Sequence, residues 1–206
     1  VGILYIATGK YDLFFERFYE SCERNFLPGV SKTYYVWTDS DKEVFNKPNI
    51  QKIFLKKAGW PYDTMMRFHH FDDASAVLSK NDYLFFFNAN MIVNNVITDN
   101  DIDLNNNLIV VDHPHFYGRH NSLFPYERNA RSAIHIPDGQ GQYYVQGCFN
   151  GGKSEYFLRM CEVLSIAISV DLSNNIIPIW HDESALNWWI WDENYKSVKV
   201  LDPGFA

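Results

Sequence analysis

The sequence has few cysteines, and their placement argues against two common uses of this residue. Only Cys22, Cys148 and Cys161 occur among the 206 residues, and no two of them form a C-x-x-C pair. An odd number at these spacings matches no zinc site, and we expect three reduced thiols rather than a disulfide.

Basic residues are also scarce: 18 lysines and arginines stand against 25 acids, which gives a formal net charge of −7. This balance gives no support to nucleic-acid binding, which requires a basic face.

Long apolar runs are missing as well. No segment approaches the roughly 20 apolar residues that a membrane-spanning helix needs, and no signal-peptide pattern is present. We therefore expect no membrane-spanning segment and a soluble, cytoplasmic protein. The chain begins at Val1 and not at a methionine, so a trimmed N-terminus is compatible with the sequence.

What the sequence does have is apolar and aromatic residues, at 47% and 17% of the chain. This is enough to build a large core in one domain or in one compact two-lobed unit. Aromatic rings can also pack on the apolar faces of sugars, but composition alone favours the ordinary core.

Strands and helices alternate through the first half of the chain. The strands that we expect cover residues 2–8, 33–38, 52–55, 83–87, 108–111, 143–150 and 197–201. The helices that we expect cover residues 12–26, 63–78, 154–170 and 182–191. This order predicts an α/β fold with a largely parallel sheet that is covered on both faces. Ligands of such sheets bind at the carboxyl ends of the strands, where residues 8–11 and 88–90 fall.

Two asparagines follow the Phe-rich strand 83–87. Asn88 and Asn90 stand where nucleotide-sugar transferases usually hold two aspartates, which grip a divalent ion that bridges the diphosphate. An amide is a poor ligand for a hard cation, but its N–H groups can donate to phosphate or hydroxyl oxygens. The alternative is an ordinary asparagine-rich turn.

Residues 180–184 (WHDES) form a second polar cluster. The single histidine at the relevant spacing argues against an H-E-x-x-H metal site. Asp182 and Glu183 suit the first turn of a helix, which is the plain explanation. A carboxylate beside an aromatic ring could also stabilise or attack an oxocarbenium-like centre in a sugar site. Arg67 lies on a largely apolar predicted helix and needs a partner. The glycines at 147, 151 and 152 either allow close approach of a ligand to the backbone or form a bulge or a turn, and we expect the pair 151–152 to break the strand that precedes it.

Taken together and in this order, the segments resemble glycosyltransferase family 6, the group of the histo-blood-group A and B transferases and the mammalian α-1,3-galactosyltransferase. The segments that carry the resemblance are 6–11 (IATGKY), 34–39 (YYVWTD), 65–67 (MMR), 113–118 (HPHFYG), 126–128 (YER), 136–137 (IP), 147–152 (GCFNGG) and 180–187 (WHDESALN). They extend over nearly the whole chain, and the last is the most specific. Their fixed order argues against chance.

The resemblance implies a GT-A fold in a single catalytic domain, 1–206. Residues 1–107 would then mainly form the nucleotide-sugar lobe, and residues 108–206 the adjoining acceptor and catalytic lobe. It also implies transfer from a UDP-sugar with retention, giving an α-1,3 linkage to a galactoside.

The resemblance further implies a role for individual residues. The implied donor-binding residues are Ile6, Ala7, Thr8, Tyr11, Arg67, Asn88, Asn90, Gln146, Gly147, Cys148 and Asp182. The first four would form the uridine wall, and residues 146–148 fall where the family chooses between N-acetylgalactosamine and galactose. The implied acceptor-binding residues are His113, Phe116, Trp180 and Glu183. Glu183 is also the implied catalytic carboxylate, which either attacks the anomeric carbon or stabilises the ion pair of a front-face displacement.

Three departures from the family pattern matter. Asn88 and Asn90 replace the aspartate pair that holds manganese in animal members, whereas bacterial members with Asn-x-Asn are regarded as metal-independent. We therefore expect a bacterial-type member with no metal and no other cofactor, in which Arg, Lys and amide N–H donors neutralise the diphosphate. A basic residue from a C-terminal tail beyond Ala206 could contribute. Pro125 replaces a hydroxyl-bearing residue, and Ala185 stands where histidine is usual.

The sequence also leads us to expect a particular donor and a particular acceptor. The small residues Gly147 and Cys148 leave room for an N-acetyl group and favour UDP-N-acetylgalactosamine (UDP-GalNAc). The expected acceptor is a galactoside with a 2-linked fucose, as in the blood-group H structure. The alternatives are a UDP-galactose transferase, a metal-dependent enzyme that uses carboxylates such as Asp112, and a sugar-binding relative without turnover.

Overall fold

The structure is a computed structural model, and it describes residues 1–193 and 195–206. Within these ranges the strands form one seven-stranded sheet in the order β3-β2-β1-β4-β6-β5-β7. The strands are β1 (Gly2–Ile6), β2 (Thr33–Thr38), β3 (Ile50–Phe54), β4 (Tyr83–Phe87), β5 (Leu108–Asp112), β6 (Val145–Lys153) and β7 (Val198–Leu201). Strands β1 to β4 are parallel, β6 is antiparallel to β4 and β5, and β7 is parallel to β5. The α/β class and the mostly parallel sheet are therefore confirmed, and the architecture is compatible with a GT-A fold.

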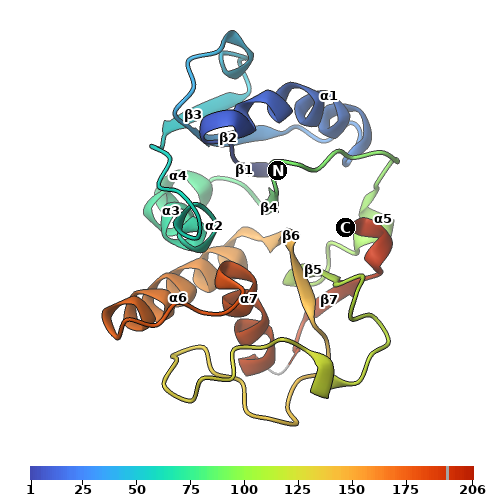
Figure 1. Cartoon of the computed structure of the whole chain (residues 1–206). Coiled ribbons are helices and arrows are strands. Elements are labelled where there is room, and N and C mark those ends of the chain that lie inside the picture. The colour runs from blue at the N-terminus through green and yellow to red at the C-terminus, as the bar shows by residue number, and fades with distance from the viewer. Residues whose placement is uncertain (194) are drawn as a thin grey trace.

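Helices cover both faces of the sheet (Figure 1). They are α1 (Phe15–Asn25), α2 (Tyr62–Met65), α3 (Arg67–Asp73), α4 (Ser75–Leu78), α5 (Asp99–Ile102), α6 (Ser154–Ser173) and α7 (His181–Asp192). Because successive strand residues point to opposite faces, Ile3 and Tyr5 pack against Phe15 and Phe18 of α1, whereas Leu4 joins the core formed with α3, α6 and α7. Of the helices in the described ranges, none is long and apolar enough to cross a bilayer.

The helix expected over 63–78 is divided into three short helices. The breaks are single residues, Met66 (φ −83°, ψ 3°) and Ala74 (φ −95°, ψ 6°), whose backbone leaves the helical range. The apolar spacing continues through both breaks, so the sequence pattern does not reveal them. The first break places Arg67 at the start of α3, where its side chain is only 2% exposed.

Strand β6 continues through the glycines that we expected to break it. Gly151 pairs with Phe85 of β4 and with Ile109 of β5, so it lies in the middle of the sheet. A β-carbon on Gly151 would overlap the Phe85 ring and the backbone oxygen of Leu84. Glycine is therefore needed for close strand packing here and not for a turn.

Residues 113–144 form a long connection between β5 and β6, at the bottom of Figure 1. Its regular structure within the described ranges is one 3-10 turn, η3 (Asn121–Leu123). The fully buried Asp171 of α6 holds one part of this connection, because its carboxylate accepts from the Ser132 hydroxyl and from the Ala133 N–H, both at 2.6 Å. The division into lobes at residue 107 stays a prediction, since a single sheet contains strands from both sides of it.

Candidate active site

A cavity of about 540 Å³ opens at the carboxyl ends of β1 and β4 and at the start of α7. Most of the residues that the sequence singled out line it: Ile6, Thr8, Tyr11, Arg67, Asn88, Asn90, Gln146, Gly147, Cys148, Trp180, Asp182 and Glu183. These residues come from five separate segments of the chain. The sheet brings three of the segments together, because the carboxyl ends of the parallel strands β1 and β4 and the start of the antiparallel strand β6 lie at one edge. The other two segments lie at the starts of α3 and α7.

A buried ion pair forms the floor of the cavity. Arg67 Nη1 lies 2.8 Å from Asp182 Oδ2, and it also donates a hydrogen bond of 2.8 Å to the carbonyl oxygen of Gly147. The guanidinium lies against the Phe86 ring, 4.5 Å from its centroid. Its Nε and Nη2 have no hydrogen-bond partner among the described residues. Burial raises the pKa of the Asp182 carboxyl, and the Arg67 charge opposes that shift.

The Glu183 carboxylate lies beside this pair and is held by two donors. The Tyr144 hydroxyl donates to Oε1 and the Gly147 N–H donates to Oε2, both at 2.9 Å. Burial raises the pKa of Glu183, and the two hydrogen bonds counter that shift. Asn187, one turn further along α7, donates to the backbone oxygens of Glu183 and Val145 at 2.9 Å each, which fixes the helix against β6.

A bulge in β6 brings Gly147 to these charged groups. Val110 of β5 pairs with Asn150, but the next residue, Val111, pairs with Gln146, so residues 147–149 bulge out of the ladder with β5, while Phe149 still pairs with Phe87 of β4. A β-carbon on Gly147 would lie 3.2 Å from Asp182 Oδ2 and 3.4 Å from Arg67 Nη2. Glycine therefore allows the backbone to contact the ion pair and the Glu183 carboxylate at once.

The turn that carries the two asparagines is fixed from behind. The Asn88 N–H donates to the Cys148 oxygen at 2.8 Å, and the Tyr5 hydroxyl donates to the Ala89 oxygen at 2.6 Å. Both asparagines line the cavity. In the described part of the chain, no group of three or more His, Cys, Asp or Glu side chains is placed to hold a metal ion.

The sequence model of glycosyltransferase family 6 matches residues 1–206. The chain belongs to glycosyltransferase family 6. Family membership implies a hexosyltransferase that uses a nucleotide-sugar donor and a glycan acceptor. The resemblance that the sequence segments carry is thereby confirmed.

This family 6 chain has bacterial and vertebrate relatives. It is 39% identical to the O-antigen biosynthesis glycosyltransferase WbnI of Escherichia coli, over 98% of this chain and 93% of the relative. It is 29% identical to the globoside alpha-1,3-N-acetylgalactosaminyltransferase 1 of Gallus gallus, over 100% of this chain and 61% of the relative. It is 28% identical to the histo-blood group ABO system transferase 2 of Rattus norvegicus, over 100% of this chain and 62% of the relative. The chain thus spans about three fifths of the two vertebrate relatives.

Three of the predicted residues of this family 6 chain lie away from the cavity wall. Ala7 is fully buried next to Ile6. His113 and Phe116 lie behind Tyr144, with ring centroids 5.7 and 4.9 Å from the Tyr144 ring. Because Tyr144 donates to Glu183, the two predicted acceptor residues are one side chain removed from the predicted catalytic carboxylate.

The cavity also contains residues to which the sequence interpretation gave no role. They are Lys57, Trp60, Asp63, Thr64 and Phe86, together with Ala89 and His181 from the segments 88–90 and 180–184 that it did single out. Trp60 is 79% exposed, and its ring contacts that of His181 edge-on at 5.0 Å. One available signal was that segment 55–61 follows the carboxyl end of β3, on the same edge of the sheet as the ends of β1 and β4.

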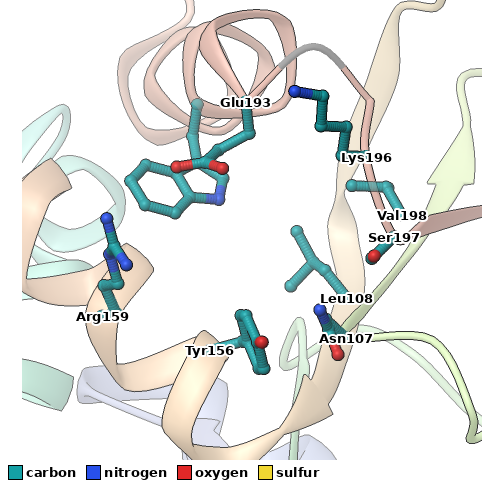
Figure 2. A pocket seen from close by; sticks show the side chains of 9 residues that line it. Asn107, Leu108, Tyr156, Arg159, Glu193, Lys196, Ser197 and Val198 are labelled. Carbon is teal, nitrogen blue, oxygen red and sulfur yellow. The ribbon is translucent and has the colours of Figure 1, made fainter.

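A second, smaller cavity lies at the amino-terminal ends of β5 and β7. Its volume is about 120 Å³, and its walls come from a different set of residues. Figure 2 shows Tyr156 and Arg159 of α6 on one side and Glu193 and Lys196 on the other. The predicted site residues therefore gather at the larger cavity.

Proposed function

We propose that this chain is a retaining, metal-independent glycosyltransferase that transfers GalNAc from UDP-GalNAc in α-1,3 linkage to a fucosylated galactoside. The observation that carries the proposal is the Glu183 carboxylate, hydrogen-bonded by Tyr144 and Gly147 beside the buried Arg67–Asp182 pair in the larger cavity. This is an arrangement in which an ionised carboxylate can face a reacting anomeric carbon.

The proposed reaction breaks the bond between the anomeric carbon and the diphosphate oxygen, and forms a bond from the acceptor O3 to the same carbon. The acceptor hydroxyl proton passes to an oxygen of the departing UDP. Ionised Glu183 either attacks the anomeric carbon or stabilises its positive charge, and both roles require the negative charge. Arg67 and Asp182 hold the donor sugar and its diphosphate, and their position in the wall of the cavity supports this role.

The uridine is assigned to the wall at the end of β1, formed by Ile6, Thr8 and Tyr11. For the diphosphate we propose amide N–H donors from Asn88 and Asn90 in place of a metal ion. The three carboxylates among the described residues that line the cavity are already engaged: Asp182 pairs with Arg67, Glu183 accepts two hydrogen bonds, and Asp63 accepts from the Ala58 N–H. This supports a site that operates by hydrogen bonding.

The choice of GalNAc over galactose rests on residues 146–148. Gly147 and Cys148 line the cavity and are small, which leaves space for an N-acetyl group. The alignment of the whole chain with a relative named as an N-acetylgalactosaminyltransferase supports this choice. A galactosyltransferase with the same machinery is the alternative.

The test is transfer from UDP-GalNAc and from UDP-galactose to a 2-fucosylated galactoside, each with excess EDTA and with manganese. We expect GalNAc transfer that is equal in both conditions. Product that forms only with manganese would contradict metal independence, and preferential galactose transfer would contradict the donor assignment.

The Glu183→Gln variant keeps the shape of the side chain but removes its negative charge. We therefore expect transfer to fall by orders of magnitude while UDP binding persists. UDP binding without product in the wild-type protein would favour a sugar-binding relative.

A further inference from the structure

We propose that Lys57 is a donor-binding residue whose ammonium group compensates the charge of the donor diphosphate. The inference rests on the proposed function, because it concerns the same cavity. A site without a metal ion needs a positive charge to balance the diphosphate. Asn88 and Asn90 can supply hydrogen bonds but no charge, whereas Lys57 supplies a charge.

The charge balance of the cavity is the first argument. Among the described residues that line it, Lys57 and Arg67 are cationic, and Asp63, Asp182 and Glu183 carry carboxylates. The Arg67 charge is already opposed by Asp182 at 2.8 Å. No carboxylate in the described ranges lies within ion-pair distance of the Lys57 ammonium. A dianionic UDP-sugar therefore meets one cation whose charge is not yet matched.

The position of Lys57 is the second argument. Its side chain lies across Gly9, at the end of β1: a β-carbon on Gly9 would be 3.1 Å from Lys57 Cδ and 3.6 Å from Nζ. Gly9 has φ +57°, and its N–H donates to Asp39 Oδ1 at 2.8 Å, so this turn is itself fixed. Lys57 thus lies beside the turn that follows β1, next to the proposed uridine wall to which Tyr11 belongs, and it lines the same cavity as the two asparagines.

The loop that carries Lys57 is braced on its other side. Asp63 Oδ1 accepts from the Ala58 N–H at 2.7 Å, and the Asp63 N–H donates to the Gly59 oxygen at 3.0 Å. These bonds fix the backbone next to Lys57, while its side chain stays exposed. The ammonium group of an exposed lysine stays hydrated until the anion binds. Its flexible side chain can keep its contact with the diphosphate as UDP departs.

The experiment is calorimetric titration of UDP and of UMP into the wild-type chain and into Lys57→Ala, Lys57→Arg and Lys56→Ala, all in EDTA. Lys56 is the matched control, because it is the exposed neighbour with the same charge but does not line the cavity. We expect Lys57→Ala to weaken UDP binding about 10- to 100-fold, as for loss of a hydrogen bond to a charged group. The loss for UMP is expected to be smaller, and Lys57→Arg should keep most of the affinity.

The control Lys56→Ala should stay within about twofold of the wild type, and the Lys57 effect should shrink as salt is raised. Equal affinities of Lys57→Ala and Lys56→Ala for UDP would overturn the role of Lys57 and leave the proposed function intact. A folded wild-type chain that does not bind UDP would overturn the proposed function, and this inference with it. The two failures are therefore distinguishable.

Discussion

At the scale of single residues, the proposed mechanism depends on carboxylates that are buried and yet must be charged. Asp182 and Glu183 are adjacent on α7, and burial raises the pKa of both. Different partners offset the cost of burying each negative charge. For Asp182 the partner is a guanidinium, and for Glu183 the partners are a hydroxyl and a backbone N–H. Each carboxylate therefore responds to the loss of a different neighbour.

Removing the Tyr144 hydroxyl should change the pH dependence of transfer. Tyr144→Phe keeps the ring but removes a hydrogen bond that stabilises the Glu183 carboxylate, so the pKa of Glu183 should rise further. Because the proposed mechanism needs ionised Glu183, activity is lost as the pH falls through that pKa. The acidic limb of the kcat/KM profile should therefore move to higher pH in the variant.

The control for this prediction is Tyr143→Phe. The Tyr143 hydroxyl accepts from the neighbouring Gln142 side chain, and Tyr143 is not among the described residues that line the cavity or that shift the pKa of Glu183. Its removal should leave the acidic limb in place. An unchanged limb in Tyr144→Phe, measured beside this control, would argue against Tyr144 as a positioning residue for Glu183.

Breaking the buried ion pair should cost both stability and donor binding. Arg67→Ala leaves Asp182 buried without its partner, so we expect the free energy of unfolding to drop by about 3–5 kcal/mol. Urea denaturation measures this loss. The double variant Arg67→Ala with Asp182→Ala should lose less than the sum of the two single variants, since the two sites are coupled.

The same Arg67 variant tests the proposed donor role. The KM for the UDP-sugar should rise more than the KM for the acceptor. An unchanged affinity for UDP and UDP-sugar in a folded Arg67→Ala protein would count against contact with the donor.

At the scale of elements, strand β6 is the part that assembles the site. Its regular half, from Asn150 to Lys153, follows the ladders with β4 and β5, whereas residues 147–149 are skipped in the ladder with β5 and Gly147 contacts Glu183 of α7. The sequence did show glycines at 147, 151 and 152, but a glycine reads equally as a turn, a bulge or a close contact. Which of these applies depends on the neighbouring strands, and those are far away in the sequence.

Gly151→Ala should destabilise the fold without touching the cavity. The added β-carbon would meet the Phe85 ring and the Leu84 backbone oxygen, and the backbone cannot move aside inside the sheet. We expect a loss toward the upper end of the ~1–3 kcal/mol that overpacking costs. Thermal unfolding measures it, with Gly204→Ala as the control because its β-carbon would meet only the Asp202 side chain at 3.2 Å. Equal melting temperatures of the two variants would contradict this prediction.

At the scale of the whole molecule, the sequence was sufficient for the order of the strands and for the edge of the sheet at which the candidate site forms, but it did not predict helix α5. Apolar runs located the seven strands, and the rule that ligands bind at the carboxyl ends of parallel strands pointed to residues 8–11 and 88–90. The roles of residues such as Glu183 came from the family resemblance, because a carboxylate in the first turn of a helix has an ordinary explanation.

The rest of the site could not be predicted because it depends on long-range packing. Lys57 and Trp60 belong to an irregular segment whose path follows from the placement of β3 next to β2. The hydrogen bond from Tyr144 to Glu183 joins residues 39 positions apart. The breaks at Met66 and Ala74 interrupt a helix pattern that is continuous in the sequence.

Gly147 has a consequence for how this enzyme can be dissected. Its N–H holds the Glu183 carboxylate and its carbonyl holds the Arg67 guanidinium, so the peptide backbone of one residue sets the spacing between the two charged groups. Alanine scanning cannot test these backbone hydrogen bonds. It normally removes a side chain, whereas at Gly147 it would add one. Only a change in the main chain itself, such as an ester in place of the amide that carries the Gly147 nitrogen, could remove this hydrogen bond to Glu183 while leaving every side chain intact.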